Sequence, residues 1–222
     1  MHLCSHAGKN GMLVVGAVSQ KGGVGKSALA RLIAREYAAS GWAVRVADFD
    51  VKQMTTTEWA ARRLAAGLEP VVEVQTYASV DKAVRGASSS DMLVIDGRGF
   101  ADRLTEDIAK VSHKILLPTG LALDDLRPSV RLAHELTEAG VNARKLAFVL
   151  CRTGDSEKEI AAARCYVEQA GYRCLAASWP ERTGFRDAHD QGKAGTEALH
   201  PSLRTKAEAV AKAMVDFIGE ED

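Results

Sequence analysis

The sequence has few cysteines and none in pairs, which excludes two classes of protein. The four cysteines of this 222-residue chain are Cys4, Cys151, Cys165 and Cys174, and no two of them form a CxxC pair. A disulfide-stabilised secreted domain and an iron–sulfur site both need closely spaced cysteines, so neither is expected. We expect reduced thiols that lie mostly in the core.

Long apolar runs and an excess of one charge are also missing. No apolar segment approaches the roughly 20 residues that span a bilayer, and 29 Lys and Arg balance 29 Asp and Glu. A neutral sum gives no general sign of a membrane or nucleic-acid partner, although a local basic face remains compatible with it. The six histidines show no metal-ligand spacing such as HExxH. We expect a cytoplasmic protein without a membrane partner.

The composition that remains is typical of a globular domain. Apolar residues make up 46% of the chain and charged residues 26%, and the length suits one domain with a sizeable core. Residues 1–11 are polar and follow neither a strand nor a helix period. We therefore expect a disordered tail at 1–11 and a single domain at 12–222, with Met1 or Met12 as the natural start.

Short apolar runs alternate with helical patterns along the chain. We expect strands at 14–19, 43–47, 71–74, 92–95, 114–117, 146–150 and 174–177. We expect helices at 27–40, 55–66, 80–86, 102–111, 157–170 and 203–218, and one that ends near 139 with Pro128 in its first turn. Such alternation predicts an α/β fold, a doubly wound and mostly parallel sheet with helices on both faces.

A glycine-rich loop follows the first strand and directly precedes the first helix. It reads Lys21-Gly22-Gly23-Val24-Gly25-Lys26-Ser27. Glycines let backbone N–H groups point at an anion, and the helix N-terminus adds positive dipole. In such a loop Lys26 reaches the β- and γ-phosphates and the Ser27 hydroxyl binds Mg²⁺. Glycine clusters also form ordinary turns, but the strand and helix on either side favour a phosphate-binding loop.

Acidic side chains follow two of the expected strands. Asp48 and Asp50 come after residues 43–47, and Asp96 follows residues 92–95. In doubly wound sheets, ligands bind beyond the carboxyl ends of the strands. Asp96 therefore suits a residue that orders Mg²⁺ through a water. An acid after a strand is also commonly a helix cap or a turn residue, and three of them beside a phosphate loop favour the metal.

The loop departs from the usual P-loop, because Gln20 replaces its first glycine and Lys21 adds a second lysine. It resembles the deviant Walker A motif of the ParA/MinD family of dimeric P-loop ATPases. The resemblance implies ATP, ADP and Mg²⁺ as cofactors, with the nucleotide held by residues 22–28, from Gly22 to Ala28. It also implies that Lys21 reaches the nucleotide of a partner subunit, and that Asp50 orients the attacking water. Lys21, Lys26 and Asp50 are then the catalytic residues, and Ser27, Asp48 and Asp96 the metal site.

Further stretches carry the same resemblance. Residues 48–54 resemble the family's first switch, although they lack its proline and have one residue more. Residues 95–99 resemble the second switch, in which Gly97 and Gly99 permit a hinge. By the same resemblance, Arg152 stacks on the adenine and the loop around Pro180 brackets it. The overall match is closest to small ParA-type ATPases that lack an N-terminal DNA-binding domain.

This resemblance implies a cargo-positioning function, either the segregation of plasmid or chromosomal DNA or the positioning of a protein cargo. An ATP-bound homodimer, with higher assemblies conceivable, binds DNA non-specifically on the nucleoid, and a ParB-like or cargo-adaptor protein stimulates its otherwise slow ATP hydrolysis. The DNA contacts are expected among basic residues of the later half: Arg164, Arg173, Arg182, Arg186, Lys193, Arg204, Lys206 and Lys212. For any single one of them, an ordinary solvated surface position is the alternative.

Other functions of the same fold remain open. A MinD-like or other regulatory ATPase uses the same loop, but the acidic end Glu220-Glu221-Asp222 would repel an anionic membrane. A metabolic ligase similar to dethiobiotin synthetase also fits, although Lys21 favours an enzyme that works between subunits. Dimerisation that depends on nucleotide would separate the ATPase from the ligase.

Overall fold

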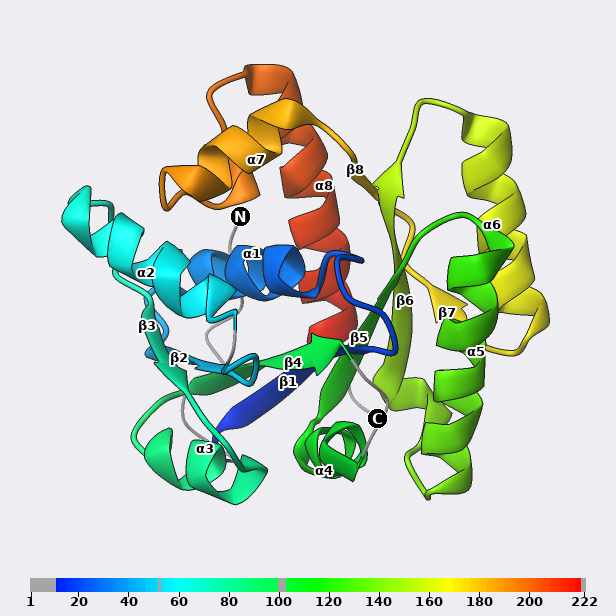
Figure 1. Ribbon diagram of the computed structural model, residues 1–222, viewed down its shortest axis with the longest axis horizontal. Coiled ribbons are helices and arrows are strands. Elements are labelled where there is room, and N and C mark those ends of the chain that lie inside the picture. The colour runs from blue at the N-terminus through cyan, green and yellow to red at the C-terminus, as the bar shows by residue number, and fades with distance from the viewer. Residues whose placement is uncertain (1–10, 52, 100–102, 221–222) are drawn as a thin grey trace.

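One eight-stranded sheet organises the chain (Figure 1). The computed structural model describes residues 11–51, 53–99 and 103–220. The strands are β1 (Leu13–Ser19), β2 (Val44–Asp48), β3 (Glu73–Thr76), β4 (Met92–Gly99), β5 (Lys114–Thr119), β6 (Leu146–Thr153), β7 (Arg173–Cys174) and β8 (Trp179–Pro180). Their order is β3-β2-β4-β1-β5-β6-β7, with β8 beside β6, and every described pairing is parallel. The predicted α/β fold is confirmed.

Helices cover both faces of this sheet. They are α1 (Lys26–Ala39), α2 (Thr55–Ala65), α3 (Val80–Gly86), α4 (Arg103–Val111), α5 (Leu123–Glu138), α6 (Glu157–Gln169), α7 (Thr183–Asp190) and α8 (Pro201–Ile218). One core cluster packs α1, α2, α7 and α8 on the sheet, and a second packs α3 to α6 on it. The central strands are buried on both faces, which explains why they are continuous apolar runs.

The prediction of a seventh strand at 174–177 is wrong. The chain there forms only the short β7, and β8 follows as a separate pairing with β6. The Arg164 guanidinium of α6 donates hydrogen bonds to the carbonyls of Cys174, Leu175 and Ala176. These carbonyls are therefore satisfied by a side chain where a longer strand would need a partner strand.

Two predictions about prolines are also wrong. Strand β5 does not stop before Pro118 but continues through Thr119, and Pro118 pairs with Val149 of β6. Pro128 lies in the second turn of α5, because the helix already begins at Leu123. Two aspartates in its first turn suit the positive end of the helix dipole.

Strands β3 and β4 differ in extent from the prediction. Strand β3 begins at Glu73, because a turn in which Val71 N–H donates to Glu69 Oε2 precedes it. Strand β4 runs past Asp96 to Gly99, so the predicted hinge glycines lie within the strand, where its register with β1 shifts between Asp96 and Gly99. A Cβ on Gly99 would lie 2.8 Å from the backbone nitrogen of Gly22. Glycine thus lets the second switch pack directly on the glycine-rich loop. The predicted start of α4 at residue 102 lies outside the described residues.

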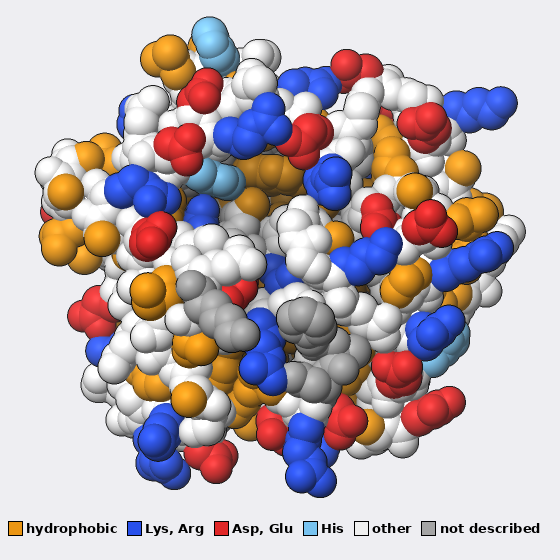
Figure 2. All heavy atoms as spheres, viewed as in Figure 1, with side chains coloured by type: hydrophobic (Ala, Val, Ile, Leu, Met, Phe, Trp, Pro, Cys, Tyr) orange, Lys and Arg blue, Asp and Glu red, His pale blue; other side chains and the backbone are white. Residues whose placement is uncertain are grey.

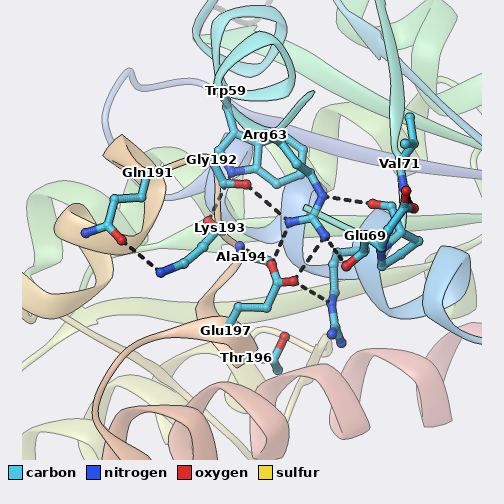
Figure 3. Close-up of polar contacts among 12 residues, drawn as sticks. Trp59, Arg63, Glu69, Val71, Gln191, Gly192, Lys193, Ala194, Thr196 and Glu197 are labelled. Carbon is cyan, nitrogen blue, oxygen red and sulfur yellow. Dashed lines mark hydrogen bonds and ion pairs between the residues drawn. The ribbon is translucent and has the colours of Figure 1, made fainter. Parts of the chain in front are cut away.

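A fully buried arginine joins α2 to the segment that follows α7 (Figure 3). The Arg63 guanidinium donates to the carbonyls of Glu69, Pro70 and Gly192 and to both carboxylate oxygens of Glu197. These five hydrogen bonds use all five of its N–H donors. A buried cation is stable only when paired and fully hydrogen-bonded, so this junction permits little rearrangement. The neighbouring Trp59 indole also donates to a carbonyl of the same segment, that of Lys193.

This junction predicts a specific effect of a single methyl group. Gly192 has φ +73°, and a Cβ there would lie 2.6 Å from the Cα of Arg63. Gly140 has φ +92° with no atom within 4 Å of its Cβ position. Both alanine variants bear the cost of positive φ, about 1 to 2 kcal/mol, but only Gly192→Ala adds a clash worth about 1 to 3 kcal/mol more. Urea unfolding should show the larger loss for Gly192→Ala, and equal losses would contradict the packing described.

Candidate functional site

The glycine-rich loop connects β1 to α1 at the carboxyl edge of the sheet. Gly23 and Gly25 have φ of +73° and +111°, which other residues rarely adopt. A Cβ on Gly25 would lie 3.0 Å from Cys151 Sγ of β6, whereas Gly22 and Gly23 face open space. Val24 is buried and anchors the loop. Contacts of Val24 and Gly25 with the core therefore fix the shape of the loop, while the backbone of Gly22 and Gly23 is exposed to solvent.

The two lysines of the loop point in different directions. Lys26 is 7% exposed, and its Nζ donates to Ser19 Oγ (2.9 Å) and to the Lys21 carbonyl (3.0 Å) of its own loop. Burial lowers the pKa of Lys26, and the charges of Asp96 and Asp50 oppose that shift. The Lys21 side chain is 43% exposed and leaves the loop, with Nζ 2.9 Å from Asp125 Oδ1 of α5. Only Lys26 is therefore placed to neutralise an anion inside this loop.

Asp96 of β4 has one carboxylate oxygen in a hydrogen bond and one without. Its Oδ2 accepts from Thr56 Oγ1 at 2.6 Å, and its Oδ1 is buried with no partner among the described residues. Burial raises the pKa of Asp96, and the nearby hydroxyls of Thr56 and Ser27 oppose the rise. A buried oxygen without a partner is costly. A cation or a cation-bound water would satisfy it, so Asp96 and the adjacent Ser27 fit a Mg²⁺ site.

Asp48 of β2 is placed differently from Asp96, its register partner. Its Oδ2 accepts from the backbone N–H groups of Thr56 and Thr57 and from the Thr57 hydroxyl, and its Oδ1 from Asp50 N–H. Both oxygens are thus used in holding the first turn of α2. The helix-cap alternative describes Asp48 in this structure, and its metal role stays a prediction.

Asp50 and Ser27 border the same region from two sides. Asp50 is half-buried, and its Oδ1 accepts from Gln53 N–H at 3.1 Å. The charge of Asp50 opposes the lowering of the Lys26 pKa by burial. Ser27 Oγ lies 3.4 Å from Thr55 Oγ1, and Ala28 packs on the core in the same first turn of α1. The structure therefore brings the predicted catalytic and metal residues together except for Lys21, whose side chain turns to Asp125, and the functions of all of them remain predictions.

The two residues predicted to contact adenine lie on neighbouring strands. Arg152 follows Cys151 on β6, and Pro180 of β8 pairs with Thr153. The Arg152 side chain is 55% exposed, with φ +57° and Nε 3.9 Å from Glu181 Oε2. Cys151, the neighbour of Arg152 on β6, contacts the Gly25 position of the loop. The Arg152 side chain points toward solvent, and Pro180 is buried.

Most of the basic residues predicted to bind DNA have partners within the chain. Arg173, Arg182, Arg186 and Lys212 pair with acidic side chains. Arg164 and Arg204 donate to backbone carbonyls, and Lys193 to Gln191. Basic and acidic side chains intermingle over the face in Figure 2 and form no basic stripe there. Non-specific DNA binding stays a prediction.

The sequence matches the profile of the CobQ/CobB/MinD/ParA nucleotide-binding domain over residues 15–194, which is more than half of the chain. The chain belongs to this family. The match includes the glycine-rich loop, both switches and β8, so the resemblance inferred from the loop is confirmed. Comparison with curated proteins gives no match.

Solved structures share the fold at low sequence identity. The cell division ATPase MinD of Pyrococcus furiosus is 17% identical with a TM-score of 0.72, covering 92% of this chain and 98% of its own. MinD of Pyrococcus horikoshii, solved with Mg-ADP, is 17% identical with a TM-score of 0.69 and coverages of 93% and 94%. A plasmid partition protein of Borrelia burgdorferi bound to AMPPNP is 12% identical with a TM-score of 0.70, covering 92% of this chain and 99% of its own. At such identities the likeness shows the fold alone.

Three residues of the site were not predicted from the sequence. They are Thr56, Arg31 and Asp125. Thr56 contacts Asp96, Arg31 contacts Thr56, and Asp125 contacts Lys21, with the two residues of each contact between 25 and 104 positions apart in the sequence. Neither a motif nor a periodicity marks them. The structure also shows no helix, among its described residues, that is long and apolar enough to cross a membrane.

A histidine near the site predicts a pH dependence of stability. The ring of His189 of α7 stacks on that of Trp179, with the ring centres 6.2 Å apart. Its Nε2 is buried without a hydrogen-bond partner among the described residues. Burial lowers the pKa of His189 to about 4, and the charges of Arg31 and Arg62 act in the same direction. Its stabilising effect is complete above the unfolded pKa of about 6.5 and is lost as the pH falls toward 4.

Replacing this histidine should therefore flatten the acid side of the stability profile. We expect wild type to lose up to about 3 kcal/mol more than His189→Gln between pH 6.5 and pH 4. Urea unfolding at steps of half a pH unit measures the difference. The control His200→Gln changes an exposed histidine and should retain the wild-type slope. A wild-type slope in His189→Gln would contradict the buried neutral imidazole.

Proposed function

We propose that this protein is a ParA-like ATPase that binds ATP with Mg²⁺ and forms a nucleotide-sandwich dimer. The observation that supports this most is the division between the two loop lysines. Lys26 is buried in its own loop, while Lys21 extends away from it into solvent and reaches Asp125. A lysine that serves only its own nucleotide has no reason to leave the loop. One that serves a partner's nucleotide has to be accessible.

The chain's own residues account for a hydrolysis reaction. Backbone N–H groups of residues 22–27 bind the phosphates, and Lys26 adds a charge-assisted hydrogen bond. Ser27 and Asp96 would hold Mg²⁺, the latter through a water, and the bound ion would supply neutralisation of the charge that develops on the phosphates. Asp50 orients the attacking water. Because phosphoryl transfer depends mainly on positioning and charge neutralisation, these groups suffice.

The cellular function that we propose is the positioning of DNA or a protein cargo. In this cycle the ATP-bound dimer binds DNA non-specifically on the nucleoid, and a ParB-like or cargo-adaptor protein stimulates hydrolysis. The likeness to a plasmid partition protein supports this function, and the likeness to MinD supports a MinD-like one equally. The apolar residues of α8, including Met214, Phe217 and Ile218, are buried in the core. They are therefore not available as a membrane-binding face, which favours DNA.

The two lysines should give different defects when replaced. Lys26→Ala should weaken ATP binding by about 100-fold or more, because the phosphates lose a buried charged partner. Lys21→Ala should bind ATP within a few-fold of wild type but should no longer dimerise or hydrolyse ATP. Fluorescent-nucleotide titration measures the first property, and gel filtration with a non-hydrolysable ATP analogue and Mg²⁺ measures the second.

The matched control is Asp125→Asn, which removes the charged partner of Lys21 and keeps the lysine. It should dimerise with nucleotide at least as readily as wild type, because Lys21 is then released from its contact within the chain. Wild-type dimerisation and turnover in Lys21→Ala would overturn the sandwich dimer. A wild-type chain that binds ATP but stays monomeric would favour the metabolic ligase.

DNA binding has its own test. Retention of the ATP-bound protein on duplex DNA should fall steeply as salt increases, because phosphate contacts release counterions. Lys206→Glu should weaken it, since this lysine lies exposed on α8 without a charged partner among the described residues. The control Lys212→Glu changes a lysine that is paired with Asp216, and should have a smaller effect. Retention that does not depend on salt or nucleotide would contradict the proposal.

A further inference from the structure

The Thr56 hydroxyl lies between a buried cation and the acid predicted to order Mg²⁺. Thr56 belongs to the first turn of α2 and is fully buried. Its Oγ1 lies 3.1 Å from Arg31 Nε of α1 and 2.6 Å from Asp96 Oδ2 of β4. Arg31 and Asp96 are 6% and 2% exposed. The three side chains thus form a short chain of hydrogen bonds away from solvent.

The chemistry of these groups fixes the direction of both hydrogen bonds. The Arg31 guanidinium is only a donor, so Thr56 Oγ1 accepts from it. The single proton of the hydroxyl is then free to be donated to Asp96 Oδ2, which is acceptor-only in the ionised form that binds a cation. Burial lowers the pKa of Arg31 only to about 10, so it remains charged at neutral pH. Asp96 Oδ2 is therefore held by the Thr56 hydroxyl, and Asp96 Oδ1 is the oxygen that has no hydrogen-bond partner among the described residues.

The position of Thr56 is itself fixed by other contacts. Its backbone N–H donates to Asp48 Oδ2 at 3.2 Å, which ties the start of α2 to β2. The Arg31 guanidinium lies 5.8 Å from the centre of the Trp59 ring, one turn further along α2. The backbone and the hydroxyl acceptor site are thus both constrained, so the hydroxyl has one orientation that satisfies every neighbour. Such constraint is typical of groups that orient a ligand of a metal site.

We propose that Thr56 is a positioning residue that holds the Asp96 carboxylate so that Oδ1 faces Mg²⁺ or its bound water. This inference rests on the proposed function, since it concerns the same metal. Thr56 opens α2 directly after the first switch, and so the helix that follows the switch also sets the metal acid. The binding of Mg²⁺ and the position of α2 are thereby coupled through one hydroxyl.

The test measures Mg²⁺ dependence and not turnover. The affinity for a fluorescent ATP analogue is titrated with MgCl₂ and, separately, measured in EDTA. Thr56→Val keeps the shape of the side chain and removes the hydroxyl, so its Mg²⁺ half-saturation should rise by about 10-fold or more. Its affinity in EDTA should stay within about twofold of wild type, because the phosphate-binding groups are untouched. Thr56→Ser keeps the hydroxyl and should restore the wild-type half-saturation to within about threefold.

Thr119→Val is the matched control, because Thr119 is also fully buried and its hydroxyl donates to a backbone carbonyl, that of Gly120. A merely structural hydroxyl at Thr56 would leave the Mg²⁺ half-saturation unchanged. That result, or an equal rise in Thr119→Val, would overturn the inference. Should Thr56→Val not fold, Thr56→Ala carries the same test, and a wild-type Mg²⁺ dependence in that variant would overturn it. Failure of the wild type to bind the nucleotide at all would instead reject the proposed function.

Discussion

Two buried carboxylates on neighbouring strands determine how this site is built. Asp48 and Asp96 are register partners on β2 and β4, and both are 2% exposed or less. Two like charges side by side in an apolar sheet are unfavourable unless hydrogen-bond donors surround them. The first turn of α2 supplies these donors from Thr56 and Thr57. The position of α2 is therefore a consequence of the two carboxylates. A cation that enters the site would change the same balance between carboxylate repulsion and hydrogen bonding.

This dependence extends beyond the site through α2. One turn after Thr56, Trp59 donates to the segment that follows α7, and Arg63 donates to Gly192 and Glu197 of the same segment. That segment follows the loop around Pro180, which is the predicted adenine side of the site. The buried ion pair with Glu197 resists separation, because breaking it would leave an unpaired buried charge. The metal side and the adenine side are therefore linked through one rigid helix.

The sequence predicted those features that local pattern alone determines. The central strands, most helices and the glycine-rich loop follow from apolar runs, periodicity and spacing. Strand β8 and helix α7 were missed, because a two-residue strand exists only through its pairing with β6. Thr56 was missed for a related reason. It lies 40 residues from Asp96, and only the register of β2 on β4 makes them neighbours, which no local pattern encodes.

The fold does not choose among the functions of this family, because a cell division ATPase and a plasmid partition protein share it with this chain at under 20% identity. The choice of function depends on polar groups that the contacts within one chain leave without a hydrogen-bond partner or accessible to solvent. Asp96 Oδ1 lacks a partner among the described residues, and the Lys21 side chain extends out of its own loop into a partly exposed ion pair with Asp125. A surface ion pair of this kind is worth at most about 1 kcal/mol. In the proposed dimer, a phosphate oxygen offered by a second subunit would therefore compete readily with Asp125 for Lys21, and this contact would oppose dimerisation only weakly.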